Sequence, residues 1–464
     1  MSAKSRRAVV LVTVVFLLVA GGLAALYLSN RREVTTTSAA AYEAYQEGVA
    51  NERRYYMKDA QVAYAKALEL DPNFAMAMLR LARASNKEKA VSLVDRAVRL
   101  RGRLNDRERL YIDLASADMA GNLEGRNKAA QAIREKYPED IDAAMILASN
   151  EMVKGNVDRA LQIFSELIAI DPNNAGVYNQ IGYYYAWRGD YDKAMENLRK
   201  YQFMAPDQAN PYDSLGEVQA FSGHYAEAIA NLNRALALKP DFFESYGHLG
   251  VAYEGMGDSA KAIESYLRAA RECTIESRRG DYLTQALRVA FRSGDKTAFR
   301  QIAQKILELP RDKQYEMIST YADAALNLLE GQPAEAERRL KELRPKLEAS
   351  FQKDLKASPY KPYFPRWNAL MALAKLQQGK SDEAIALYEE LANPPIPWGN
   401  FEQRRYVYEG RARLAELLAR KGDLDRAEKL LAENHRWNPD WAPSKPAELV
   451  VSQLRREKVL AATH

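Results

Sequence analysis

Apolar and polar positions in the middle of the chain follow a helical pattern that repeats every 34 residues. Three residue types recur in register: Tyr178, Tyr212 and Tyr246; Gly182, Gly216 and Gly250; Ala194, Ala228 and Ala262. Each unit reads as two amphipathic helices joined at a turn glycine such as Gly223 and ended by a proline such as Pro240. One such hairpin cannot bury its apolar face alone. The period therefore predicts a stacked array of helix pairs.

Weaker copies of the pattern flank these units. Ala60, Tyr64 and Ala67 before Pro72 reproduce the second half of a unit, and similar halves follow near residues 382–388 and 425–439. The sequence thus predicts an all-α array of about eight to ten helical hairpins. The expected parts are degenerate hairpins over 41–140, well-formed repeats over 141–274, divergent hairpins over 275–442, and a capping helix and tail over 443–464.

The N-terminal segment has a different pattern, with no charged residue between Ala8 and Leu28. About 20 apolar residues span a bilayer core as a helix, whereas a cleaved signal peptide has a shorter apolar region. We expect a short tail over 1–7, an uncleaved transmembrane signal anchor over 8–28 and a linker over 29–40. Basic residues are slightly more numerous on the N-terminal side, which places the bulk of the chain outside the cytoplasm of a bacterial cell.

The composition of the chain argues against several classes of function. The chain has 464 residues and a net charge of +5 with acids and bases interspersed, which does not favour nucleic-acid binding. The only cysteine, Cys273, cannot form an intrachain disulfide; we interpret it as a core residue, with a reactive thiol as the alternative. The 4 histidines are too scattered to predict a metal site. Since no phosphate-loop, nucleophile or zinc-protease motif occurs, we predict neither an enzyme nor a bound cofactor.

The repeated units resemble tetratricopeptide repeats. The family pattern W-x2-L-G-x2-Y…A-x3-F…P is matched by one unit at Tyr178, Ile181, Gly182, Tyr185, Ala194, Leu198 and Pro206. This resemblance implies a right-handed superhelical solenoid that binds peptides or partner proteins on its concave face. The segment Leu104–Leu110 is also similar, over few residues, to repeat domains of bacterial signalling proteins.

Mapping the family's concave face onto this sequence gives seven candidate partner-binding residues. They are Asn179, Tyr183, Asn210, Asp213, Glu217, Glu244 and Glu254. Their acidic character, with one aromatic ring and two amides, favours a basic or amide-rich extended partner. The alternative is an ordinary solvated surface. The family's clamp for C-terminal carboxylates is not expected, because Glu217 and Val251 stand on that stripe instead of basic or amide residues.

A second candidate surface is a proline- and aromatic-rich insertion, which we place at 345–367. Its aromatic residues are Tyr360, Tyr363, Phe364 and Trp367. They either contact a partner or a lipid surface, or pack back onto the array. Together the patterns predict a membrane-anchored scaffold for protein partners. The alternative is a non-catalytic sensor or regulatory subunit of a membrane signalling or secretion complex.

Overall fold

The computed structural model describes residues 34–273, 276–308, 313–354, 364–393 and 401–462. Within these ranges the regular structure is entirely helical, which confirms the all-α prediction. The predicted membrane anchor at 8–28 lies outside them. Among the helices that the structure does describe, none has the length and apolar character needed to cross a bilayer.

The described chain forms two compact units, one up to Ala143 and one from Ala144 onward. The first contains α2 (Ala39–Arg53), α3 (Met57–Leu70), α4 (Ala75–Arg83), α5 (Lys87–Arg99), the 3-10 turn η1 (Arg101–Arg103), α6 (Asp106–Met119) and α7 (Leu123–Lys136), and α8 (Ile141–Val153) contains the boundary.

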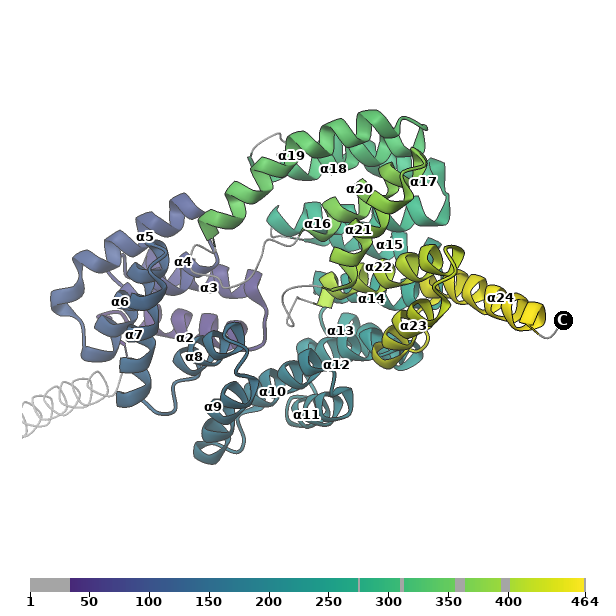
Figure 1. Ribbon diagram of the computed structural model, residues 1–464. Coiled ribbons are helices and arrows are strands. Elements are labelled where there is room, and N and C mark those ends of the chain that lie inside the picture. The colour runs from purple at the N-terminus through teal and green to yellow at the C-terminus, as the bar shows by residue number, and fades with distance from the viewer. Residues whose placement is uncertain (1–33, 274–275, 309–312, 355–363, 394–400, 463–464) are drawn as a thin grey trace, which may run out of the picture. The chain divides into compact units, whose positions relative to one another are not determined.

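The second unit (Figure 1) continues with α9 (Val157–Ile170), α10 (Ala175–Arg188), α11 (Tyr191–Met204), α12 (Ala209–Phe221), α13 (Tyr225–Leu238), α14 (Phe243–Met256), α15 (Ser259–Glu272), α16 (Glu276–Ser293), α17 (Lys296–Leu307), α18 (Lys313–Leu329), α19 (Pro333–Asp354), α20 (Pro365–Gln377), α21 (Ser381–Ala392), α22 (Phe401–Arg420), α23 (Leu424–Trp437), the 3-10 turn η2 (Ala442–Ser444) and α24 (Lys445–Ala462). From α2 to α23 the described helices make eleven consecutive pairs, one more than the upper limit expected.

In the first unit, the described part of the expected linker is attached to the helices at Thr35. The Thr35 backbone N–H and hydroxyl donate to the two carboxylate oxygens of Glu108, at 2.7 and 2.6 Å. Glu108 also forms a capping box with Asn105 at the start of α6, so one side chain orders both segments. Helix α2 begins at Ala39 with Ser38 as its N-cap, inside the range assigned to the linker.

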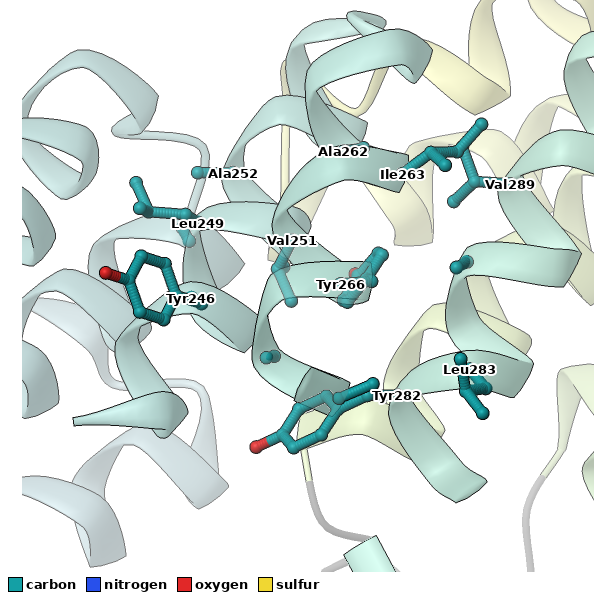
Figure 2. Packing of buried hydrophobic residues seen from close by; sticks show 14 of the residues in the cluster. Tyr246, Leu249, Val251, Ala252, Ala262, Ile263, Tyr266, Tyr282, Leu283 and Val289 are labelled. Carbon is teal, nitrogen blue, oxygen red and sulfur yellow. The ribbon is translucent and has the colours of Figure 1, made fainter. Parts of the chain in front are cut away.

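Close approach of two helices explains the repeated glycines in the second unit. A Cβ atom on Gly216 of α12 would lie 2.7 Å from Leu232 Cγ of α13 and 3.1 Å from the Ala228 carbonyl oxygen. Gly250 of α14 lies against the Tyr266 ring in the same manner. Figure 2 shows this next repeat, in which Val251 of α14 lies near Tyr266 of α15 within the buried cluster. The regular spacing therefore reflects helix packing.

The insertion is shorter than the sequence suggested. Helix α19 continues through Pro345 to Asp354, and α20 begins at Pro365. A proline within a helix removes one backbone hydrogen bond but need not end the helix. The boundary expected at Pro345 was therefore wrong by at least two helical turns.

Candidate functional site

Helix α22 packs against the first helices of the well-formed repeats, a contact between segments more than 200 residues apart. Arg404 donates hydrogen bonds to the carbonyl oxygens of Ala186 at 3.0 Å and Trp187 at 2.6 Å, near the end of α10. These belong to the last turn, whose carbonyls have no partner within the helix. The Arg404 guanidinium also lies 4.8 Å from the centroid of the Trp437 ring. Arg404 thus joins α22, α23 and α10.

Asn438, the residue after α23, makes a similar contact with the end of α12. The buried Asn438 side chain accepts a hydrogen bond from the Tyr225 hydroxyl at 2.9 Å and donates one to the Phe221 carbonyl at 3.1 Å. Successive repeats therefore hold successive parts of the C-terminal region. Within the second unit, the array turns back on itself.

The third contact is a buried ion cluster around Glu254 of α14. One Glu254 carboxylate oxygen lies 2.6 Å from Arg288 Nη2, and the other lies 2.6 Å from Arg292 Nη1. Arg405 of α22 approaches at 3.4 Å, and Glu409 of α22 pairs with both Arg288 and Arg292. Burial would raise the pKa of Glu254, but the surrounding arginines outweigh it and lower that pKa.

This geometry corrects the expectation for Glu254. Its side chain is 0% exposed, and Arg405 is 1% exposed. A solenoid seen in isolation would leave Glu254 on an open inner face. Here α22 covers it and supplies the basic group that the sequence assigned to a partner, so Glu254 is an internal packing residue.

The two amides of the predicted stripe are also internal. Asn179 and Asn210 are buried, and Asn179 Nδ2 lies 3.4 Å from Asn210 Oδ1, which also accepts a hydrogen bond from the Tyr201 hydroxyl at 3.1 Å. These contacts join neighbouring repeats. They satisfy buried polar atoms.

The remaining candidates meet around a histidine that the sequence reasoning did not select. His248 of α14 places Nδ1 3.0 Å from Asp213 Oδ1 and Nε2 3.5 Å from Glu217 Oε1. The Tyr183 hydroxyl donates to Glu217 at 2.6 Å, and the Ser245 hydroxyl donates to Asp213 at 2.6 Å. We call Tyr183, Asp213, Glu217, Glu244 and His248 the acidic cluster.

Charges within the acidic cluster shift each other's protonation. Burial lowers the pKa of His248, but Asp213 and Glu217 outweigh it and raise that pKa to about 10. His248 is therefore a cation at neutral pH. Burial raises the pKa of Glu244 to about 7, although Arg278 lies 3.3 Å away. The cluster is acidic, but less so than the sequence implied.

Sequence signals for the missed residues differ in strength. His248 lies one helical turn after Glu244, and Arg288 lies one repeat period after Glu254, so both positions were open to inference. No local pattern pairs Arg404, Arg405 or Glu409 with residues more than a hundred positions away.

Two aromatic residues of the insertion pack onto the array. This agrees with the interpretation that the insertion packs back onto the array instead of contacting a partner or a lipid surface. Trp367 Nε1 donates to the Leu340 carbonyl oxygen at 2.7 Å. The Arg344 guanidinium lies 4.7 Å from the Trp367 ring centroid and 4.8 Å from that of Phe364. Tyr360 and Tyr363 lie outside the described residues.

A cavity of about 430 Å³ lies between the middle repeats and the C-terminal helices of the second unit. Its lining comes from α14, α15, α16, α17, α18, α20, α21, α22 and the η2–α24 segment. Cys273 is buried elsewhere in the core. Within the described ranges, no group of three or more histidine, cysteine, aspartate or glutamate side chains is arranged to hold a metal ion.

These features define a helical repeat protein whose last helices pack on its central repeats. Residues 120–175, 175–208 and 243–272 match tetratricopeptide repeat models, and residues 222–257 match a TPR repeat model. The chain therefore contains tetratricopeptide repeats, as the sequence resemblance indicated. Repeats of this kind are suited to protein–protein interaction.

Several solved structures show partial similarity. The type IV pilus biogenesis factor PilW is 17% identical, with 44% of this chain and 94% of that chain covered and a TM-score of 0.37. A chain of the APC/C hetero-tetramer Cut9–Hcn1 is 13% identical, with 94% of this chain and 81% of that chain covered and a TM-score of 0.46. A tetratricopeptide repeat protein from Parabacteroides merdae is 12% identical, with 58% of this chain and 98% of that chain covered and a TM-score of 0.40. No functional conclusion follows from similarities at this level.

Proposed function

We propose that this protein is a membrane-anchored, non-catalytic scaffold that binds a basic segment of a partner protein at the acidic cluster. The observation that carries the proposal is the meeting of three carboxylates from two successive repeats, Asp213, Glu217 and Glu244. Asp213 is buried, whereas the side chains of Glu217 and Glu244 remain partly exposed. Residues 8–28 provide the anchor, and the repeats lie on the extracytoplasmic side of the inner membrane.

Binding at this place involves an exchange of cations. Arg278, whose side chain is 52% exposed, lies 3.3 Å from Glu244. A lysine or arginine of the partner replaces Arg278 at Glu244 and extends toward Glu217. Exposed ion pairs are weak, so this exchange requires little free energy. Specificity then comes from the spacing of the partner's basic residues.

Capture from intact membranes tests the binding surface. Cells carrying the wild-type chain or the Glu217→Gln/Glu244→Gln double variant are crosslinked, and the retained proteins are identified. We expect a specific partner with a basic segment to be retained by the wild type and lost with the double variant. Glu227→Gln/Glu264→Gln, which changes two exposed glutamates on the second helices α13 and α15, serves as the matched control. Equal capture by all three chains contradicts the proposed surface.

Protease accessibility tests the anchor and its orientation. When spheroplasts are treated with an added protease, an extracytoplasmic repeat array is cleaved while cytoplasmic marker proteins stay intact. Protection of the repeats until the membrane is broken contradicts the orientation. Release of the chain from membranes by salt or carbonate washing contradicts the anchor itself.

The cavity favours the second candidate function, a sensor or regulatory subunit. A space of this size, bounded by both the middle repeats and the C-terminal helices, gives a small molecule a direct effect on how those helices pack. A ligand-dependent change in partner capture separates this role from that of a constitutive scaffold.

A further inference from the structure

The cavity of the second unit has the size and lining of a small-molecule site. Its volume of about 430 Å³ lies within the range of roughly 300–1,000 Å³ that is usual for ligand sites. Apolar side chains from several helices line it, among them Leu287, Phe291, Leu370 and Leu373. The inference concerns this cavity alone and is independent of partner binding at the acidic cluster.

Two buried tyrosines add uncharged polar groups to the wall of the cavity. Tyr321 and Tyr388 both line it and are only 7% and 3% exposed. Neither hydroxyl has a hydrogen-bond partner among the residues that the structure describes. Burial raises the pKa of both hydroxyls above the usual range, so each remains protonated and able to donate. Both hydroxyls are uncharged donors, so a ligand oxygen in the cavity can provide each with a hydrogen-bond partner.

The charged residues of the lining neutralise one another. Four arginines line the cavity, and each has an acidic partner: Arg288 and Arg292 pair with Glu254 and Glu409, Arg366 with Asp281, and Arg413 with Glu416. No arginine is left to match a ligand anion, and the lining glutamates Glu254, Glu409 and Glu416 are all engaged. A charged ligand beside the buried pairs of Glu254 with Arg288 and Arg292 would have to break one of them as it left water.

We propose that the cavity binds a neutral, largely apolar small molecule that carries a hydroxyl or carbonyl oxygen. The apolar lining takes the body of the ligand, and the tyrosine hydroxyls bond its oxygen. Because the walls come from both the middle repeats and the C-terminal helices, the bound molecule also connects the two regions.

Photolabelling of the full-length membrane chain tests the site with three probes of nearly equal shape. These are 4-(hydroxymethyl)benzophenone, which is neutral, 4-benzoylbenzoate, an anion, and 4-(aminomethyl)benzophenone, a cation. Labelled peptides are mapped by mass spectrometry. We expect saturable labelling by the neutral probe on peptides from α16, α18, α20 and α22, at least tenfold above either charged probe. Diffuse labelling without enrichment on these helices, or stronger labelling by a charged probe, overturns the proposal.

Three variants make the result specific to the cavity. Leu373→Trp fills the cavity and is expected to abolish the saturable labelling, whereas Leu449→Trp adds the same side chain at a position that is 73% exposed and leaves the labelling unchanged. Tyr321→Phe/Tyr388→Phe keeps the shape of the walls. It is expected to weaken labelling by the neutral hydroxyl probe by about 2- to 12-fold for each hydrogen bond lost. Labelling by 3-phenyl-3-(trifluoromethyl)diazirine, a neutral probe with neither a hydroxyl nor a carbonyl oxygen, is expected to be unaffected. Equal loss for both neutral probes, or none for either, contradicts the assigned role of the hydroxyls even if Leu373→Trp does not fold.

Discussion

Glu254→Gln is the sharpest test of how the second unit is held together. The substitution keeps the size of the side chain but removes the charge that Arg288, Arg292 and Arg405 share. Glu409 still pairs with Arg288 and Arg292, whereas the buried Arg405 loses its contact with the Glu254 carboxylate and keeps its contact with the Tyr266 hydroxyl.

The magnitude follows from burial. Removing one partner of a buried ion pair costs about 3–5 kcal/mol, because the other charge stays desolvated. With Glu254 and Arg405 both almost fully buried, we expect the free energy of unfolding of the second unit to fall within this range. Helix α22 should detach first, since its link to α14 runs through this cluster.

Two measurements check this prediction. Urea unfolding followed by circular dichroism gives the change in stability, and hydrogen exchange reports whether α22 and α14 lose protection. Repeat arrays do not always unfold in one step, so the local measurement is needed. Glu264→Gln, at an exposed site on α15, is the matched control. A Glu254→Gln chain as stable as this control, with α22 still protected, refutes the reasoning.

The effect also has a defined pH dependence. The pKa of Glu254 in the folded protein lies below its usual value of 4.5. Its contribution to stability is therefore complete above pH 4.5 and is lost as the pH falls below that value. The stability difference between wild type and Glu254→Gln should therefore be constant from pH 7 to 5. Below that range it should shrink by up to about 1.4 kcal/mol per pH unit. A difference that grows on acidification contradicts the assigned charge state.

Three further predictions concern the repeats themselves. Gly216→Ala should destabilise the second unit by about 1–3 kcal/mol, because the added methyl group overlaps Leu232, and urea unfolding measures this; an unchanged midpoint contradicts the close approach. The pKa of His248 is raised from 6.5 to about 10, so its ionic contribution is complete below 6.5 and is lost as the pH rises toward 10. His248→Gln should therefore cost most stability below pH 6.5 and progressively less above it in parallel melts; a cost independent of pH contradicts the ion pairing. Because protonated Glu244, with a pKa of about 7, cannot attract a cation, capture of a basic partner should weaken as the pH falls from 8 to 6, and pH-independent capture argues against Glu244 as a contact.

Sequence reasoning reached most of the local structure. The recurring glycines and alanines predicted helix pairs because the same close contacts, such as Gly216 with Leu232, are needed in every repeat. The insertion boundary at Pro345 was harder, since a proline weakens a helix without always ending it. The number of pairs was underestimated because helices outside the strong repeats keep the amphipathic pattern but not the regular period.

The candidate site was predicted only in part. Asp213, Glu217, Glu244 and Tyr183 do meet, since residues one period apart in neighbouring repeats become neighbours in space. Glu254 has the same periodic position as a solvated inner residue, yet it lies beneath α22. The repeat period predicts contacts within a repeat and between neighbouring repeats. It cannot predict a contact between α14 and α22.

By itself, the sequence determined the helical hairpins, their stacking and the repeat family, because these depend on contacts within about one period of the chain. Only the tertiary structure decided that the C-terminal helices fold back onto the central repeats. It also decided that arginines of the chain itself neutralise Glu254 and that a cavity lies between the two regions. The physical reason is that small rotations between successive repeats accumulate along an array. The position at which the end of the array meets its middle is therefore set by the sum of many packing contacts.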